Sequence, residues 1–181
     1  MNIFILDPKP EIAAIMQCDK HVVKMVLETA QLLSTAHHEL SETHGYSVDK
    51  DELYKRTHKN HPCAIWVRTC PENYDWTYHH LIALLDEYTH RYGRTHKTSR
   101  LVFILRNNPF GGVVGDPIDA VSYSAPKCMP DDLKKDGVVG IKFDYPHTGW
   151  AKDGGFDDDS YTTVSAYRKI FELCREGLGP D

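Results

Sequence analysis

Three side chains capable of acid–base or nucleophilic chemistry lie at helical spacing near the start of the chain. His21, Lys24 and Glu28 belong to the segment QCDKHVVKMVLETAQLLST, residues 17–35. At about 100° per residue, they share one face of a helix. Glu28 can act as a general acid or base, His21 can orient it or shuttle a proton, and a desolvated Lys24 can act as an amine nucleophile. The spacing predicts a catalytic centre on this helix.

The rest of the predicted helix is apolar almost all the way round. Its polar stripe also contains Gln17, Gln31 and Thr35, and it is flanked by Met25, Leu27 and Leu32. A surface helix normally has a wide polar face, and buried polar groups are costly without partners. The stripe therefore predicts a pocket. A buried Lys24–Glu28 pair beside a satisfied histidine is the structural alternative.

A second cluster follows in the sequence THKNHPC, residues 57–63. Pro62 predicts the first turn of a helix, whose free N–H groups and positive dipole end suit a phosphate. We expect this cluster to bind substrate, with Trp66 near a base and the polar groups near phosphate: His58, Asn60, His61 and Arg68. The alternative is a capping turn with solvated histidines.

A third cluster ends the long helix predicted to start at Pro71. Tyr88, Arg91 and Tyr92 combine aromatic rings with a cation, a combination that can stack on a base and hold phosphate. The alternative reading is a Glu87–Arg91 pair one turn apart and a cationic last turn that complements the helix dipole.

Metal and cofactor chemistry receive less support. Cys18, His21, His58 and His61 have permissible zinc spacing, with Cys63 as a spare ligand. Such pairs arise easily in a chain with 11 histidines, so we predict an anion there instead of a metal. The chain has no glycine-rich phosphate loop, no GxGxxG and no GxSxG, and we predict no cofactor.

Composition places limits on the class of protein. The 181 residues fit one domain, 41% of them are hydrophobic, and no apolar run is long enough to span a membrane. The start, MNIFILDPKP, lacks secretory-signal features, and five scattered cysteines fit a reduced cytoplasmic compartment. The net charge of −5 is unusual for a general nucleic-acid binder but allows a local basic cleft.

We predict a mainly α fold with a helical core over residues 1–106. MNIFIL forms a short extended segment, helices begin at Pro10, Pro62 and Pro71, and Gly93 ends the longest helix. Residues 39–58 are predicted to be a loop, and 98–106 a further helical piece. Residues 107–160 form a loop-rich insertion with a small hairpin over Val138–Tyr145, and a C-terminal helix spans 161–176.

Two resemblances rest on these residues. The blocks MNIFILD, CDKHVVKMVLETAQLLSTAH, THKNHPCAIWVR and EYTHRYGRTHK resemble small uncharacterised phage-encoded proteins. The chain also resembles phage pyrimidine-dimer DNA glycosylases, in which a glutamate follows the histidine of an Asp-Gln-His triplet by seven residues. Asp19-Lys20-His21 and Glu28 have that spacing. Related helical enzymes that modify thymine in phage DNA are similar as well.

The glycosylase resemblance implies a small helical enzyme whose N-terminal α-amine is the nucleophile and whose helical glutamate is the catalytic carboxylate. Here these are Met1 and Glu28, because Asn2 is bulky enough for Met1 to be retained. The chain differs from those enzymes in its acidic charge, in an end without their aromatic and basic tail, and in residues 107–160.

We therefore predict a glycosylase-like enzyme that acts on DNA or a nucleotide, in the cytoplasm of an infected cell. Met1 or Lys24 supplies the amine, assisted by Glu28 and His21. The alternatives are a non-catalytic phage protein that sequesters a nucleotide or binds a host protein, and a structural protein in which these residues support stability only.

Overall fold

The computed structural model describes residues 2–44, 48–115 and 126, and within them the chain is mainly helical. The prediction of a mainly α fold is confirmed, and these residues contain no strand. The elements are α1 (Pro10–Ile15), α2 (Asp19–His44), α3 (Pro62–Val67), α4 (Pro71–Tyr92), the 3-10 helix η1 (Lys97–Leu101) and α5 (Val102–Leu105). Met1, the predicted hairpin, the C-terminal helix and most of the predicted insertion lie outside the described residues.

Proline and glycine set several helix boundaries as predicted. α1, α3 and α4 each begin at a proline, which needs no N–H partner in the first turn. Gly93 ends α4 with a φ of 60°, a left-handed conformation that glycine adopts without strain. The piece predicted over 98–106 is η1 followed by the four-residue α5.

The loop predicted over residues 39–58 is wrong in its first part. α2 continues without interruption to His44, so Glu39 and Leu40 are helical. The segment is polar, but it contains no glycine or proline before Gly45, and its glutamates and leucine favour a helix. α2 also begins at Asp19, so Gln17 lies in the break between α1 and α2.

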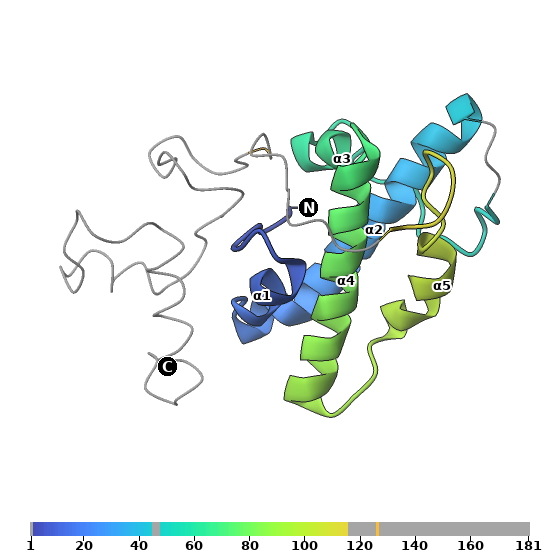
Figure 1. Cartoon of the computed structure of the whole chain (residues 1–181). Helices are drawn as coiled ribbons and strands as arrows, with labels where there is room; N and C mark the ends of the chain where they lie inside the picture. The colour runs from blue at the N-terminus through green and yellow to red at the C-terminus, as the bar shows by residue number, and fades with distance from the viewer. Residues whose placement is uncertain (1, 45–47, 116–125, 127–181) are drawn as a thin grey trace, which may run out of the picture.

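α4 is the central helix and packs against both α1 and α2, while α2 also contacts α3 and η1. Figure 1 shows α1 on one side of α4 and α5 on the other, with α2 crossing behind. The largest fully buried side chains come from the N-terminal segment, α2, α4, η1 and α5: Ile3, Leu6, Met25, Leu32, Leu33, Tyr74, Trp76, Leu81, Leu84, Leu101 and Leu105. Burial of these groups is the main source of stability.

The N-terminal segment is an extended arm packed on the helices. Ile3, Phe4, Ile5 and Leu6 are all buried. The arm is secured at its end, where the Trp76 indole N–H donates to the Pro8 carbonyl at 2.7 Å. The predicted extended segment is thus a part of the core, and this position brings the start of the chain to α2.

Two buried histidines connect the elements in their neutral forms. His80 Nδ1 donates to the Pro10 carbonyl, so its Nε2 accepts from the Gln17 amide at 3.0 Å. Tyr74 donates to the Leu105 carbonyl, so His37 Nε2 donates to the Tyr74 oxygen. Burial lowers the pKa of His80 to about 4, and burial followed by the charge of His38 lowers the pKa of His37 to about 4.

The first residues of the predicted insertion fold back on α4. Asn107 and Val113 form a bridge, and Asn108 and Gly115 donate to the Asp75 carboxylate. Burial, the largest effect, raises the pKa of Asp75. None of the helices in the described part of the chain has the length and apolar character needed to cross a membrane.

Candidate active site

The polar stripe of α2 is covered by the N-terminal arm. The Asn2 backbone N–H donates to Glu28 Oε2 at 2.9 Å, and the Phe4 ring stacks on His21 with centroids 4.7 Å apart. Residues two apart in an extended segment point to the same side, and residues seven apart in a helix lie on nearly the same face. The arm therefore runs antiparallel to α2 along the stripe, and His21 and Glu28 share one face as predicted.

Glu28 is held between a backbone donor and a lysine. Its Oε1 lies 3.4 Å from Lys24 Nζ, and its Oε2 accepts from Asn2. The Glu28 side chain is 13% exposed and the Lys24 side chain is 70% exposed. Glu28 is therefore nearly withdrawn from solvent, whereas the Lys24 amine is well hydrated.

The Asn2 side chain fixes the position of the arm. Its Oδ1 accepts from the Ile3 N–H at 2.9 Å and from the Cys63 thiol at 3.3 Å. Asn2 and Cys63 are both buried. Because Cys63 lies on α3, three separated parts of the chain meet at Asn2: the arm, α2 and α3. No pattern in the sequence indicates a side-chain role for Asn2, and Cys63 was expected only as a spare metal ligand.

The predicted phosphate-binding turn lies at the edge of this group. His61 is the N-cap of α3, where its Nδ1 accepts from the Cys63 N–H at 3.2 Å. The pKa of His61 is lowered by burial first, then by the positive charges of the N-terminal amine and of His58, and is raised by Glu28. The Cys63 thiol, two residues after His61, bonds the same Asn2 whose backbone N–H donates to Glu28, so the turn lies near the carboxylate.

His58 and Asn60 are exposed on the turn, which is attached to α2. Thr35 Oγ1 donates to the Thr57 carbonyl and accepts from the Thr57 N–H, at 3.2 and 3.3 Å. His58 has a φ of 47°, uncommon for a residue with a side chain. Thr35 lies seven residues after Glu28, so the turn is held above the same face of α2.

α3 carries two buried donors that have no partner among the described residues, Trp66 Nε1 and Arg68 Nη1. Trp66 is 5% exposed and packs edge-on against Trp76, so its ring belongs to the core. Arg68 is half-buried. A guanidinium without a partner is a suitable anion ligand because the hydrogen bonds it can form are charge-assisted.

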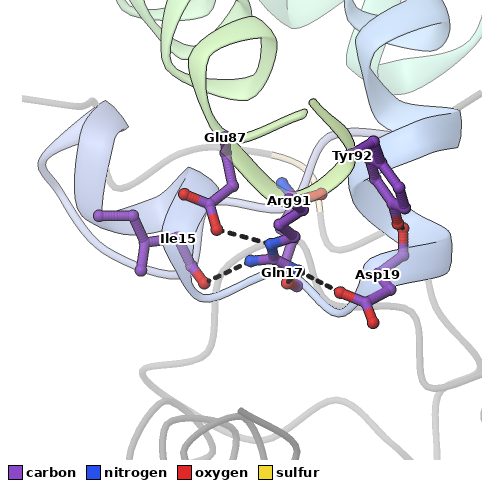
Figure 2. Close-up of polar contacts among 6 residues, drawn as sticks. All are labelled: Ile15, Gln17, Asp19, Glu87, Arg91 and Tyr92. Atoms are coloured by element: carbon purple, nitrogen blue, oxygen red, sulfur yellow. Dashed lines mark hydrogen bonds and ion pairs between the residues drawn. The ribbon is translucent and has the colours of Figure 1, made fainter. Parts of the chain in front are cut away.

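The third predicted cluster lies at the junction of α1 and α2. Figure 2 shows the Arg91 guanidinium among Glu87, Asp19 and the backbone of Ile15 and Gln17. Arg91 bonds Glu87 at 2.6 Å, Asp19 at 2.9 Å and both carbonyls, and is only 12% exposed. The Tyr92 hydroxyl donates to the Asp19 carbonyl at 3.0 Å, and Tyr88 packs on Tyr92 and His96.

The structure therefore divides the predicted site residues into two groups. His21 and Glu28 contact the arm, Lys24 pairs with Glu28, and His61 caps α3, whose Cys63 bonds Asn2. Arg91 and Tyr92 hold the start of α2 at Asp19, nine residues or about 13 Å along the helix from Glu28. The Glu87–Arg91 pair expected as the structural alternative is present, and the Lys24–Glu28 pair is present with an exposed lysine instead of being buried.

Over the described residues, no group of three or more histidine, cysteine, aspartate or glutamate side chains is arranged to hold a metal ion. The chemistry that this part of the chain offers is that of a carboxylate beside a lysine amine, with the His21 imidazole on the same face of α2. Such a group can stabilise a developing positive charge and move protons.

Comparison with known proteins identifies the family. A family model described as pyrimidine dimer DNA glycosylase matches residues 1–100, which include the arm, Glu28, α3 and α4. No curated protein and no solved structure matches the chain. The match covers more than half of the 181 residues, and the chain belongs to the pyrimidine dimer DNA glycosylase family.

Proposed function

We propose that the chain removes a damaged pyrimidine from DNA, with an amine as nucleophile and Glu28 as the assisting carboxylate. The observation that carries the proposal is the 2.9 Å bond from the Asn2 N–H to Glu28 Oε2. This bond attaches the start of the chain to a carboxylate whose side chain is only 13% exposed. The family to which the chain belongs is described as a DNA glycosylase.

Met1 is the better candidate for the amine. Its nitrogen is separated from the Asn2 nitrogen by only two carbon atoms, so the two lie within about 4 Å in any conformation. The Met1 amine is therefore within about 7 Å of the Glu28 carboxylate.

The ordinary acidity of amines also favours Met1. An α-amine titrates near pH 8 and a lysine amine near 10.4, so at pH 7 roughly a tenth of α-amines but fewer than one in a thousand lysine amines are neutral. Only the neutral form has a lone pair for attack. Lys24, at 70% exposure, lacks the desolvation that would make it a nucleophile.

In the proposed reaction the amine nitrogen forms a bond to the sugar C1′ while the bond from C1′ to the base breaks. The base leaves with the electron pair and takes a proton from water. Glu28 stabilises the positive charge that develops on the sugar, accepts a proton from the attached amine and returns it to O4′ as the ring opens. The product is a protonated imine between the protein and C1′. His21 and His61 assist proton movement, and His58, Asn60 and Arg68 contact phosphate.

Borohydride trapping on a duplex with one pyrimidine dimer tests the proposal. Wild-type protein is expected to form a covalent adduct, and Glu28→Gln to lower its rate by at least roughly 100-fold. Glutamine keeps an acceptor for the Asn2 N–H, so this variant preserves the fold. The Lys24→Met variant should still be trapped, whereas selective acetylation of the α-amine should abolish trapping.

The same experiment separates the alternative functions. An adduct that maps to Lys24 would contradict Met1 as the nucleophile but would still support the glycosylase function. Absence of any adduct, together with tight binding of a nucleotide, would instead indicate sequestration. Base modification without release of the base would indicate a thymine-modifying enzyme.

A further inference from the structure

Two stretches of the chain carry only positive charge, although the whole protein has a net charge of −5. Residues 53–71 contain four lysines and arginines, residues 88–115 contain five, and neither stretch has an aspartate or glutamate. Segregation of this kind indicates a local cationic surface on an acidic protein.

The structure joins parts of these two stretches. The Tyr54 hydroxyl and the Thr98 hydroxyl are 2.8 Å apart, and the Arg100 guanidinium lies 5.5 Å from the centre of the Tyr54 ring. Arg100 also donates to the Glu52 carbonyl at 2.9 Å. The loop at residues 54–61 and the helical segment η1–α5 therefore form one continuous region, which we call the basic track.

The basic track leads to Glu28. His38 donates to the Tyr54 carbonyl at 2.9 Å, and Thr57 is bonded to Thr35. The loop ends at His61, two residues before Cys63, whose thiol bonds the Asn2 that donates to Glu28. His38 lies ten residues after Glu28, so the loop covers about 15 Å of α2. This distance equals about four steps of a DNA strand, at about 3.4 Å each.

Five cations in the track or directly next to it are available to a ligand, whereas Arg56 is paired with Glu39 and Arg100 is held by the Glu52 carbonyl. Lys55, Lys59, Arg94, Lys97 and Arg106 are exposed, and none of them has an ion-pair partner among the described residues. This distinguishes them from Arg91, whose guanidinium is occupied by Glu87 and Asp19. The carboxylates nearest in sequence to the track, Asp49, Asp51 and Glu52, precede it.

An exposed aromatic ring lies among these cations. Phe103 is 82% exposed, the largest exposure of any large hydrophobic side chain in the described residues. Arg100 and Arg106 are three residues before and after it, a spacing that places all three on one side of η1–α5. Cations that alternate with an aromatic ring match a nucleic-acid strand, which alternates phosphates with apolar sugars and bases.

We propose that the basic track binds the DNA that flanks the lesion, with Lys97 and Arg106 on phosphates and Phe103 against a sugar or base of the same strand. The identity of the ligand rests on the proposed DNA-directed function, but the location rests on charge and exposure alone. Lys97, Phe103 and Arg106 position DNA and take no part in the chemistry at Glu28.

Binding of an undamaged 24-base-pair duplex at several salt concentrations tests this. The logarithm of the binding constant falls linearly with the logarithm of the salt concentration, and each phosphate contact adds about one to the magnitude of that slope. Lys97→Ala and Arg106→Ala should therefore each weaken binding and reduce the magnitude of the slope by about one. Lys9→Ala, an exposed lysine at the start of α1, removes the same charge elsewhere and should change neither. Equal results for Lys97→Ala and Lys9→Ala would overturn the proposal.

Phe103→Ala gives an independent readout, because an apolar contact releases no counterions. Binding should weaken by roughly fivefold at every salt concentration with an unchanged slope. Since Phe103 is 82% exposed, its truncation should leave the fold intact. If Phe103→Ala instead changes the oligomeric state and not DNA binding, the patch binds a second copy of the chain and the proposal fails.

The two proposals can fail separately. Undamaged DNA contains no base to excise, so a protein that is never trapped on damaged DNA can still show the expected salt slopes. Conversely, Lys97→Ala and Arg106→Ala could be trapped at the wild-type rate and show unchanged salt slopes. That result would support the glycosylase function and contradict DNA binding by the basic track.

Discussion

The Asn2 backbone N–H donates to Glu28 Oε2 across 26 residues of sequence, at 2.9 Å. The bond connects the second residue of the chain to the only carboxylate of the α2 polar stripe. A charge-assisted bond of this kind is about twice as strong as one between neutral groups, and it fixes both the arm and the rotamer of Glu28. The position of the arm and the position of the Glu28 carboxylate therefore depend on the same hydrogen bond.

Replacement of Asn2 by proline tests this relationship, because proline has no N–H to donate. With both variants produced in the absence of methionine aminopeptidase, so that Met1 stays next to the smaller residue, we expect Asn2→Pro to lower the rate of adduct formation more than Asn2→Ala, which keeps the backbone donor. Asn2→Ala should cost about 1–3 kcal/mol of stability, since the Ile3 N–H and the Cys63 thiol lose their acceptor. Equal adduct rates in the two variants, measured by single-turnover trapping, would contradict a role for the N–H.

Lys24 provides a second prediction about the same carboxylate. Its side chain is 70% exposed and lies 3.4 Å from Glu28, so the pair is screened by water. Exposed pairs one helical turn apart contribute about 0.3–0.5 kcal/mol. Lys24→Met should therefore change the free energy of urea unfolding by less than about 0.5 kcal/mol. A larger loss would show that Lys24 has a structural role.

Much of the helical fold could be predicted because its boundaries are encoded locally. Pro62, Pro71 and Gly93 mark ends of α3 and α4 through their own backbone preferences. The end of α2 could not be placed in this way. Its last turns are polar and resemble a loop by composition, yet no breaker precedes Gly45 and the helix continues to His44.

The site was predictable only where one helix decides the geometry. His21 and Glu28 share a face because of their spacing, which is a property of α2 alone. That Asn2 would bond Glu28, or Phe4 stack on His21, depends on where the arm packs, and no local pattern encodes this. Arg91 looked like a ligand-binding cation because its carbonyl partners at the α1–α2 break are invisible in the sequence.

We expect Arg91 to stabilise the folded protein instead of binding a ligand. Its removal leaves Glu87, which is 11% exposed, without its cation and frees two carbonyls. Breaking a largely buried pair costs about 3–5 kcal/mol, so Arg91→Ala should destabilise the protein by several kcal/mol in urea unfolding. Arg56→Ala breaks a pair with Glu39 in which the arginine is 54% exposed, and should cost less than about 1 kcal/mol. Comparable losses in the two variants would contradict the structural role.

Acid should destabilise the fold through its two buried histidines. Both have a pKa of about 4 when folded against an ordinary 6.5 when unfolded, so the unfolded chain binds protons first. Their contribution is fully present above about pH 6.5 and is lost as the pH falls toward 4. The loss is on the order of a few kcal/mol. Asp75 acts in the opposite direction, since burial raises its pKa and its cost disappears in acid.

Urea unfolding at pH 7 and pH 5 measures this dependence, with ring titrations of His37 and His80 by NMR as the site-specific readout. We expect a lower unfolding free energy at pH 5 and no protonation of either ring until well below pH 6. His80→Gln should reduce the difference between the two pH values, because glutamine keeps a donor for the Pro10 carbonyl but does not titrate. If the rings titrate near 6.5 in the folded protein, the neutral hydrogen-bonded assignment of these histidines is wrong.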